Sequence, residues 1–571
     1  MSNAKGPIGK MAAFLRLSGP GWLQSAITLG GGSLGSALYL GVLGGSQLLW
    51  VQVVAVLIGV VMLSAIAYVT LSTRIRPYHA INQYVNPVLG IGWILATILA
   101  NMIWIMPQFS LCFDALHNNI WPQQIDDSQS TQLQVSIVLG VLALIAVVMS
   151  FRPGWMSRIF DLCLKIVVGL IVACFVWAIV FLTRQGELDW SEIWTGFIPK
   201  LENWNQPAPD IANLIGNLPE QWQQFWSDRI VGSQQKVIIS AAATAVGINM
   251  TFLLPYSMSA RGWDKPFRGL ARFDFITAMA IPFMLVTSCI VLASAHSLHG
   301  KVDESFLSDD ATTIMQSRSF TGDATKHLQA RYLEENGEDS LNEFVIKADD
   351  LDDEKAIKDK RKKEKLAAYA ATLSKDERRV ISTLIKPNTS QLADSLKPVL
   401  GDNANLIFGL GAFAMGFSTM IILMMINGYA VAEVLGNYEN TACRTFGALL
   451  AGIVGVFWIL IWKGQAKTWV IIAASSFGAM LLPIAYFAFL LLMNNERLLG
   501  DAKPRGLKMV IWNVLMSIGV AGAVLNAYPA LSGELAKPES GKIVLGALIT
   551  FGAFVLLGFS ARFTGRTTVE R

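Results

Sequence analysis

The residues of this chain that are best suited to hold a small ion or solute interrupt a long apolar segment. Gly30, Gly31, Gly32 and Ser33 stand in the middle of residues 19–45, a stretch long enough to cross a bilayer. Glycine costs roughly 1 kcal/mol relative to alanine inside a helix. Three glycines in a row therefore predict either a close contact with another helix or an unwound stretch whose backbone faces protein or water. Unwound stretches of this kind commonly form the substrate sites of secondary transporters.

A second interruption falls in residues 236–259, the sixth apolar segment of the chain. Asn249 and Thr251 supply polar atoms, Met250 supplies a soft thioether, and Pro255 removes a backbone donor and kinks a helix. Taken alone, the pattern is equally compatible with a kinked helix whose polar groups bond to its neighbours. Its correspondence with the interruption in the first segment favours a carrier site built from two broken helices. The predicted substrate-binding residues are Gly30, Gly31, Gly32, Ser33, Asn249, Met250 and Thr251.

The predicted site lacks an ionised side chain, because neither segment carries Asp or Glu at its centre. The backbone of a broken helix can serve either sign of charge: amino ends of half-helices suit anions, whereas carboxyl ends and free carbonyls suit cations. Metal ligands therefore stay unknown at this stage. Ionisable residues inside apolar segments are functional candidates by default, although contacts at the membrane interface explain them equally well. They are Asp114, Asp161, Lys165, Asp274 and Glu433.

The segments that must position these residues are strongly apolar. The chain has 571 residues, of which 53% are hydrophobic and 15% charged, against about 25% charged residues in a soluble domain. Twelve apolar runs are long enough to span a membrane, which predicts an all-α polytopic membrane protein. The predicted spans are 19–45, 48–73, 90–116, 133–151, 157–182, 236–259, 271–296, 404–434, 445–463, 468–494, 507–530 and 541–561.

The Lys and Arg residues of the short connections fall mainly on one side of this arrangement. That side also carries Lys5, Lys10 and Arg16. Because cytoplasmic loops are enriched in Lys and Arg, both termini are predicted to be cytoplasmic, in a cell (cytoplasmic or inner) membrane. The first residues lack the pattern of a cleavable signal peptide. The five cysteines form no CxxC pair, so neither a disulfide framework nor a zinc site is predicted.

The motifs of enzymes and of nucleotide-binding proteins are missing from the sequence. It lacks a nucleophile elbow, a Walker-type phosphate loop and a cluster of metal ligands, and the glycine run lacks the strand-helix context of a nucleotide fingerprint. We therefore predict no enzyme activity, no cofactor and no nucleic-acid partner. The predicted partners are the lipid bilayer and a small ion or solute, with a gradient as the source of energy.

Two long connections lie on the side opposite the termini. Residues 183–235 are rich in tryptophan, which favours the headgroup boundary, and predict an interfacial, partly helical cap rather than a ligand-stacking surface. Residues 297–403 predict a charged extramembrane insert, in which Lys355 to Ala371 has the pattern of an exposed helix. The acidic run 349–354 lacks the glycine and the ligand spacing of an EF-hand calcium loop.

The chain therefore divides into segments of alternating character. The predicted segments are a cytoplasmic N-terminus (1–18), spans 1–5 as a first repeat (19–182), a Trp-rich outer loop (183–235), spans 6–7 (236–296), the insert (297–403), spans 8–10 (404–494), spans 11–12 (507–561) and a cytoplasmic C-terminus (562–571).

Three motifs resemble the natural resistance-associated macrophage protein (NRAMP) family of proton-coupled divalent metal transporters, within the superfamily of leucine-transporter-like carriers. The resemblance covers most of the chain outside residues 297–403. It implies ten core helices as two inverted five-helix repeats with broken helices 1 and 6, plus two extra helices. The motifs are Gly19-Pro20-Gly21-Trp22-Leu23, the stretch Phe408 to Glu433 with Gly416-Phe417-Ser418-Thr419 and Asn427-Gly428, and Leu481-Leu482-Pro483-Ile484-Ala485 with the loop Asn494 to Gly500.

The family binds its metal through an Asp-Pro-Gly-Asn motif in the first broken helix and a Met-Pro-His motif in the sixth. In this chain Gly30-Gly31-Gly32-Ser33 takes the place of the first motif, so the carboxylate is missing. Counting from Gly247 places Thr251-Phe252-Leu253 at the second motif, with Met250 one position away. An ion would then rest on carbonyls, hydroxyls and waters. The loss of the methionine fits magnesium, which keeps several waters, whereas the loss of the aspartate does not.

The resemblance favours a secondary transporter of a divalent metal cation, partly hydrated and magnesium- or manganese-like, with an atypical site. Two alternatives stay open. Glycine amides at the end of a half-helix also suit the carboxylate of an amino acid or another small organic solute. A non-transporting membrane receptor with the same fold is the other alternative, and the long insert would then be its functional part.

Overall fold

The computed structural model describes residues 9–564, with gaps at residues 10, 12, 15–16, 153, 338–351, 386–403, 462–469 and 537–539. The regular elements of this part of the chain are helices. Eleven of them are long and apolar enough to cross a membrane, or twelve if a bent pair of shorter helices counts as one span. The prediction of an all-α polytopic membrane protein with about twelve spans is therefore confirmed.

Two of the spans are interrupted, as the sequence predicts. The first consists of α2 (Pro20–Thr28) and α3 (Gly31–Gly44), which are bent by 50° relative to each other. The sixth consists of α11 (Glu220–Ala245) and α12 (Ile248–Ala260). The other long helices are α4 (Trp50–Thr73), α6 (Pro87–Ala115), α7 (Gln129–Phe151), α8 (Trp155–Gln185), α14 (Ile281–Leu298), α21 (Ala404–Val434), α22 (Thr441–Val456), α24 (Val470–Asn494), α26 (Leu507–Leu535) and α27 (Ser540–Thr564).

Short helices connect or extend these spans. The seventh span begins with α13 (Arg268–Asp274) and a π-helical turn, η4 (Phe275–Ala280), which lead directly into α14. The remaining helices, which lie outside the long spans, are α5 (Pro77–Tyr84), η1 (Leu116–Ile120), α9 (Trp190–Gly196), η2 (Leu201–Trp204), α10 (Pro209–Gly216), η3 (Lys265–Phe267), η5 (Glu304–Leu307), α15 (Ala311–Gln316), α16 (Gly322–Asn336), α17 (Asp352–Thr372), α18 (Lys375–Thr383), α23 (Trp458–Ile461), α25 (Glu496–Leu499) and η9 (Gly500–Ala502).

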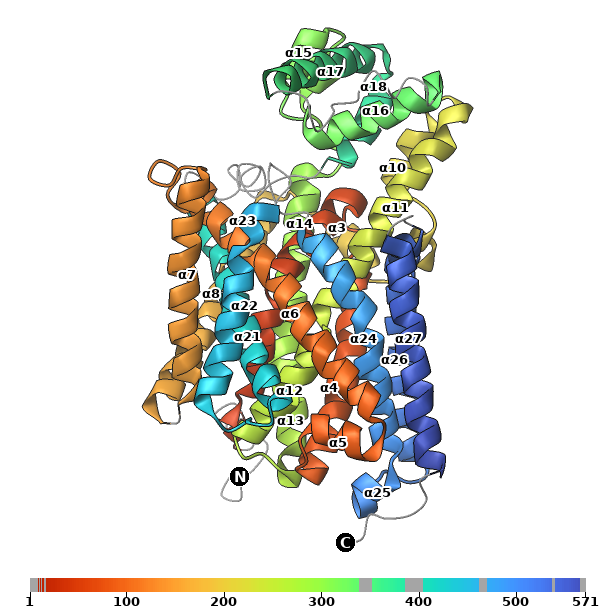
Figure 1. Cartoon of the computed structure of the whole chain (residues 1–571). Coiled ribbons are helices and arrows are strands. Elements are labelled where there is room, and N and C mark those ends of the chain that lie inside the picture. The colour runs from red at the N-terminus through yellow and green to blue at the C-terminus, as the bar shows by residue number, and fades with distance from the viewer. Residues whose placement is uncertain are drawn as a thin grey trace.

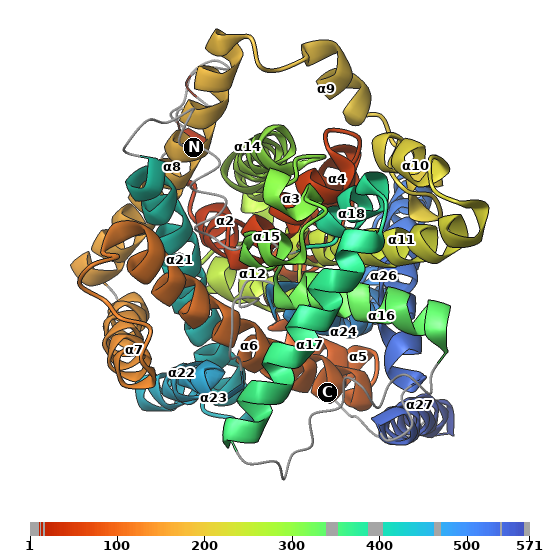
Figure 2. The ribbon, with the colours of Figure 1, turned by 90° about the horizontal axis from the view of Figure 1, so that it is seen from above.

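The broken helices lie inside the bundle, whereas α7 and α27 lie at its edges (Figures 1 and 2). The most apolar 18-residue window of α11 and α12 is 94% buried by protein, and that of α27 is not buried at all. The end of the bundle where α2 begins and α27 ends is called the terminal side below. The opposite end, which carries α15 to α18, is called the insert side (Figure 1).

A second hydrophobic core lies outside the bundle on the insert side. Trp226 and Ile230 of α11 are buried in it against Leu328 of α16 and Leu366 of α17. We call this unit, formed by α10, the start of α11 and α15 to α18, the outer domain. Helix α11 thus begins within the range predicted as a loop and belongs to both cores. The helix predicted at 355–371 is part of α17, and residues 349–351 of the acidic run lie outside the described residues.

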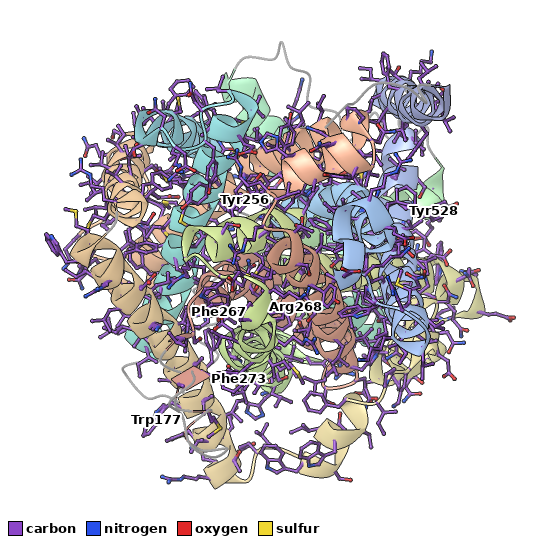
Figure 3. The ribbon with its side chains drawn as sticks, turned by 90° about the horizontal axis from the view of Figure 1, so that it is seen from below. Trp177, Tyr256, Phe267, Arg268, Phe273 and Tyr528 are labelled. Atoms are coloured by element: carbon purple, nitrogen blue, oxygen red, sulfur yellow. The ribbon has the colours of Figure 1, made fainter. Side chains whose placement is uncertain are left out.

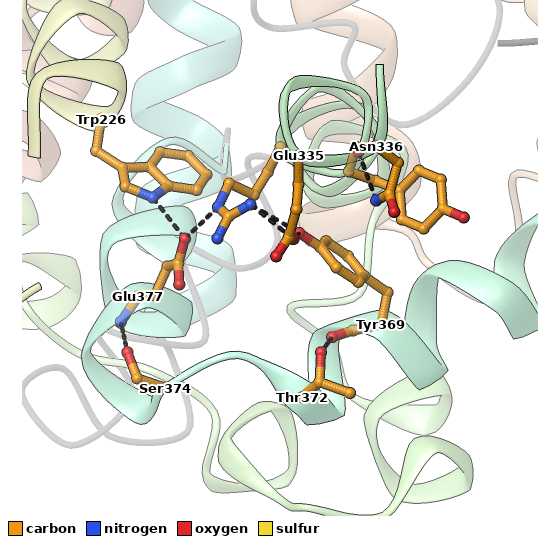
Figure 4. Close-up of polar contacts among 9 residues, drawn as sticks. Trp226, Glu335, Asn336, Tyr369, Thr372, Ser374 and Glu377 are labelled. Carbon is orange, nitrogen blue, oxygen red and sulfur yellow. Dashed lines mark hydrogen bonds and ion pairs between the residues drawn. The ribbon is translucent and has the colours of Figure 1, made fainter. Parts of the chain in front are cut away.

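A buried ion pair and its hydrogen bonds join four helices of the outer domain, α11, α16, α17 and α18 (Figure 4). The Nε of Arg331 on α16 donates to Oε1 of Glu377 on α18 over 2.7 Å, and the Trp226 indole donates to the same oxygen over 2.8 Å. The Arg331 guanidinium also donates to Glu335 and to the Tyr369 hydroxyl, over 2.9 Å each. Burial and the hydrogen bond to Glu335 raise the pKa of Tyr369. The hydroxyl therefore stays protonated and donates to Glu335.

We expect Glu377→Ala to destabilise the outer domain, because the Arg331 guanidinium would stay buried without its main partner. Breaking a buried pair in this way costs about 3–5 kcal/mol. The measurement is limited proteolysis of the detergent-purified protein along a temperature ramp, and the cleavage of the outer domain should begin at a lower temperature. Asp376→Asn is the matched control, because Asp376 pairs with Arg379 at the surface. Equal cleavage temperatures for the two variants would contradict the stabilising role of the pair.

Candidate functional site

The first break separates Thr28, the last residue of α2, from Gly31, the first residue of α3. Between them Gly30 is extended, with φ of −103° and ψ of −176°. The Ser33 hydroxyl donates to the Thr28 carbonyl freed by the break. The Gly31 N–H donates to the side-chain oxygen of Gln108 on α6, over 3.1 Å. Backbone groups that the helix no longer satisfies are thus satisfied by protein, as a membrane interior requires.

The second break is tied to the first through Met250. Gly247 is extended between α11 and α12, with φ of −85° and ψ of 168°. The Met250 N–H is bound by the Gly247 carbonyl at 3.1 Å and by the side-chain oxygen of Asn249 at 2.9 Å. From α2, the Gln24 amide donates to the Met250 carbonyl and the Thr28 hydroxyl donates to the Met250 sulfur, each over 3.4 Å. The two broken helices therefore contact each other at their breaks.

Glycine is required at both breaks for space. A Cβ atom on Gly30 would clash with the hydroxyl of Thr419 on α21, and one on Gly247 would lie 2.5 Å from the Trp104 ring of α6. Neither glycine has a positive φ, so other residues could adopt the backbone conformation. Residues with a side chain are excluded at these two positions because α6 and α21 approach the breaks too closely.

A small cavity of about 20 Å³ lies between the two breaks. This volume holds about one water molecule or a small ion. Three of the predicted residues, Gly32, Ser33 and Met250, line it, and Gly30 and Gly31 adjoin it along the backbone. The other polar side chains of the lining belong to Gln108, Thr244, Thr419 and Ser475.

Two predicted residues of α12 lie outside the cavity lining. Asn249 directs its oxygen to the Met250 N–H, and its amide nitrogen is buried without a hydrogen-bond partner within the described part of the chain. Thr251 accepts a hydrogen bond from the indole of Trp93 on α6, over 3.1 Å. Thr251 therefore belongs to the contact between α12 and α6, and Met250 is the residue of this turn that reaches the cavity.

Four polar lining residues, Gln108, Thr244, Thr419 and Ser475, are not among the substrate-binding residues predicted from the sequence. Gln108 follows Pro107 in an otherwise apolar span, and an amide in such a position is a signal that would have found it. Thr244 and Ser475 carry no comparable signal, because Ser and Thr are common inside membrane helices, where they bond across to neighbours. Their role depends on which helices meet at the cavity.

The cavity lining is uncharged. Among the described residues, no three His, Cys, Asp or Glu side chains converge as metal ligands. Two of the ionisable candidates, Glu433 and Asp161, bind basic side chains away from the cavity instead. The Glu433 carboxylate lies 2.9 Å from Arg76 and 3.1 Å from His79, and Asp161 lies 2.8 Å from Arg261. Neutral oxygens and one thioether suit a cation that keeps part of its water shell better than a bare one.

Two broken helices that meet at a cavity inside a bundle of about twelve spans define the fold of a secondary transporter with inverted repeats. The chain belongs to the natural resistance-associated macrophage protein-like (NRAMP) family, whose sequence profile matches residues 21–318 and 366–528. The resemblance of the sequence motifs to this family is therefore confirmed, and with it the arrangement of two five-helix repeats and two extra helices. The unmatched stretch between these two ranges, 319–365, lies within the predicted insert.

The fold is similar to that of solved structures of the Eremococcus coleocola manganese transporter. A point mutant of that protein superposes with a TM-score of 0.56 at 14% sequence identity, over 96% of this chain and 94% of the other. The complex of that transporter with an aromatic bis-isothiourea substituted compound gives a TM-score of 0.56 at 13% identity and the same coverage. No curated protein sequence matches the chain. At this level of identity the likeness shows the fold.

We expect Gly30→Ala to lower the thermal unfolding midpoint in detergent by at least about 2 °C. The added methyl group would meet the Thr419 hydroxyl and lie 2.9 Å from the Ile27 carbonyl, and overpacking of this kind costs about 1–3 kcal/mol. Gly169→Ala in α8 is the matched control, because nothing lies within 4 Å of its added Cβ. Alanine is favoured in helices, so the control should be as stable as the parent or more stable. A Gly30→Ala midpoint equal to that of the control would show that the break has spare room.

Proposed function

We propose that this chain is a secondary transporter that moves a divalent metal cation through the cavity between α2/α3 and α11/α12. The observation that carries the proposal is the position of this cavity, at the contact between both broken helices of an NRAMP family member. The similar solved structures are those of a manganese transporter, which supports a divalent cation as the substrate class. The proposed binding groups are those of Gly30–Ser33, Met250, Gln108 and Thr419, with Asn249 and Thr251 supporting the second break.

The size of the cavity supports an ion over an organic solute. Pockets for small organic molecules usually measure about 300–1,000 Å³, whereas this cavity measures about 20 Å³. The uncharged lining supports a cation that arrives with some of its waters, because a dehydrated divalent ion is normally held by one or two carboxylates. The lining suits a magnesium-like or manganese-like ion. Because the cavity of about 20 Å³ has room for only the bare ion or one water molecule, binding of a partly hydrated ion would require the cavity to widen.

The Met250 sulfur would favour manganese over magnesium. Magnesium takes oxygen ligands almost exclusively, whereas a thioether can contribute to the binding of a transition metal. Met250 lines the cavity, and its sulfur accepts a hydrogen bond from the Thr28 hydroxyl over 3.4 Å. A substrate ion that contacts it would have to displace this hydrogen bond. We therefore propose that the site distinguishes manganese-like from magnesium-like ions through Met250.

We also propose that the terminal side faces the cytoplasm of the cell. Its connections carry most of the Lys and Arg residues of the short loops, including Arg74, Arg76, Arg261 and Lys265, as cytoplasmic loops do. The energy for transport would come from an ion or substrate gradient, because the sequence carries no Walker-type motif.

The test is uptake of manganese and of magnesium into proteoliposomes, with and without an imposed pH gradient. We expect saturable uptake, and we expect Met250→Leu to raise the KM for manganese by about fivefold or more while leaving magnesium uptake within about twofold, as the loss of one weak ligand predicts. Met258→Leu is the matched control, because Met258 is buried in the same helix away from the cavity.

The two alternatives to metal transport correspond to other outcomes of this experiment. Absence of flux for both ions in a folded preparation would contradict the proposal and would direct attention to small organic solutes. Absence of any solute flux would leave the receptor as the remaining alternative. If Met250→Leu changed the uptake of both ions equally, the proposal of metal transport would stand, but the proposal of selection by the thioether would be contradicted.

A further inference from the structure

A second cavity, of about 490 Å³, lies at the surface of the bundle on the terminal side. Its lining comes from the end of α5, the end of α24, the short helix α25 and the edge helix α27. None of the residues that line it also lines the cavity between the two breaks. Cavities of a few hundred Å³ commonly hold an organic molecule. We call this cavity the α27 pocket.

The α27 pocket lies where apolar spans end. The candidate span Ala474–Asn494 ends within its lining, and the span Gly541–Ser560 ends one residue after Phe559, which lines it from α27. Leu491 and Phe559 therefore stand at membrane depth, whereas Arg497 lies beyond the last apolar turn. Figure 3, which views the terminal side, shows α27 at the edge of the bundle, where its most apolar window is not buried by protein. The pocket thus lies at the boundary between lipid and water.

The wall that α27 contributes to the pocket is tied to the bundle through Asn86. The Asn86 amide donates to the Val555 carbonyl of α27 over 2.9 Å. A Cβ atom on Gly558 would lie 2.6 Å from the side-chain oxygen of Asn86, so this close approach requires glycine. Phe559 follows directly in the chain. Its position beside the pocket is therefore set by the contact between α27 and the start of α6.

The amide side chains of the lining are occupied by contacts within the protein. Asn495 donates to the Tyr84 carbonyl over 2.8 Å and accepts the N–H of Leu498 over 3.0 Å. Asn494 exchanges two hydrogen bonds with Asn513 of α26, over 2.8 and 3.1 Å. These contacts hold α5, α24, α25 and α26 together around the pocket. Its charged residues are then left to determine which ligand it binds.

The two charged residues of the lining differ in their partners. Glu496 lies 3.4 Å from Lys503, so its charge is compensated. Arg497 is exposed and forms no hydrogen bond or ion pair with another residue in the described part of the chain. A guanidinium binds phosphate well, because it can donate two parallel hydrogen bonds to it. The α27 pocket therefore combines an unpaired cation with an apolar wall, formed by Leu491 and Phe559.

We propose that the α27 pocket binds one anionic phospholipid, whose phosphate group is held by Arg497 and whose acyl chains lie along Leu491 and Phe559. Basic pockets between membrane-spanning helices bind the head groups of anionic lipids. A soluble phosphate would use the same guanidinium but would leave the apolar wall uncovered, so the wall favours a lipid as the source of the phosphate. The proposal is independent of the proposed transport function, because it concerns a separate cavity.

The test is native mass spectrometry of the full chain in detergent, titrated with phosphatidylglycerol or with phosphatidylcholine of the same acyl chains. We expect the first phosphatidylglycerol to bind at least about fivefold more tightly than phosphatidylcholine, whose choline group cancels the charge of the phosphate. Arg497→Gln should weaken the binding of phosphatidylglycerol about tenfold, as the loss of a charge-assisted hydrogen bond predicts. Arg505→Gln is the matched control, because Arg505 is exposed on the same connection and does not line the pocket.

The apolar wall is tested by a second variant. Phe559→Ala keeps the cation and removes part of the contact with the acyl chains, so it should weaken the binding of phosphatidylglycerol by about fivefold. Phe554→Ala is its control, because Phe554 is exposed on the same helix and does not line the pocket. Free sn-glycerol 3-phosphate, which carries the phosphate without acyl chains, should not displace the lipid at an equal concentration.

Three results would overturn the proposal. Equal affinities for the two lipids, or equal affinities of Arg497→Gln and Arg505→Gln for phosphatidylglycerol, would exclude recognition of the anionic head group. An unchanged affinity in Phe559→Ala would exclude contact with the acyl chains. Displacement of the lipid by free glycerol 3-phosphate would identify a soluble phosphate as the ligand instead. Failure of metal uptake in the parent protein would change none of these readouts, because they measure lipid binding alone.

Discussion

A helix that stops and restarts inside a bilayer leaves backbone groups to which lipid cannot form hydrogen bonds. In this chain two such helices form hydrogen bonds with each other. The carbonyl and sulfur of Met250 accept hydrogen bonds from Gln24 and Thr28 of the other broken helix. Gln108 takes the Gly31 N–H from a third helix. Because these partners are few and buried, the positions at which the helices cross are fixed, and the cavity follows from that crossing.

An uncharged cavity is the second consequence of this arrangement. The backbone and neutral side chains provide the polar atoms of the lining, while the buried carboxylates Asp274 and Glu433 lie toward the terminal side, where backbone N–H groups or basic side chains bind them. An isolated carboxylate at the cavity would carry a large desolvation cost whenever no cation was bound. A neutral site avoids this cost, and under the proposed function it would hold a cation more weakly than a carboxylate would, so that the ion could leave.

Helix α11 joins the site to a part of the protein that most of the bundle does not touch. Trp226 near its start is buried in the outer domain and bound to Glu377, whereas Thr244 near its end lines the cavity. One continuous helix therefore has its two ends in two hydrophobic cores. The outer domain and the cavity are therefore physically connected through α11.

The sequence by itself determined the spans, the two breaks and the family, because hydropathy over about twenty residues, a run of glycines and short motifs are local properties. It did not show that α11 begins at Glu220, since residues 220–235 are polar and are helical partly because the outer domain buries Trp226 and Ile230. Hydropathy therefore places the start of the sixth span at 236.

Only the tertiary structure decided which polar groups face the cavity. Met250 and Thr251 are neighbours, but consecutive residues of a helix point about 100° apart, so the residue that reaches the site depends on where α12 restarts after Gly247. Packing against Trp93 and Trp104 sets that restart. Gln108 and Asp274 likewise reach α2 and α3 from 77 and 253 residues away. Contacts over such separations depend on how helices pack together, and no local pattern in the chain specifies them.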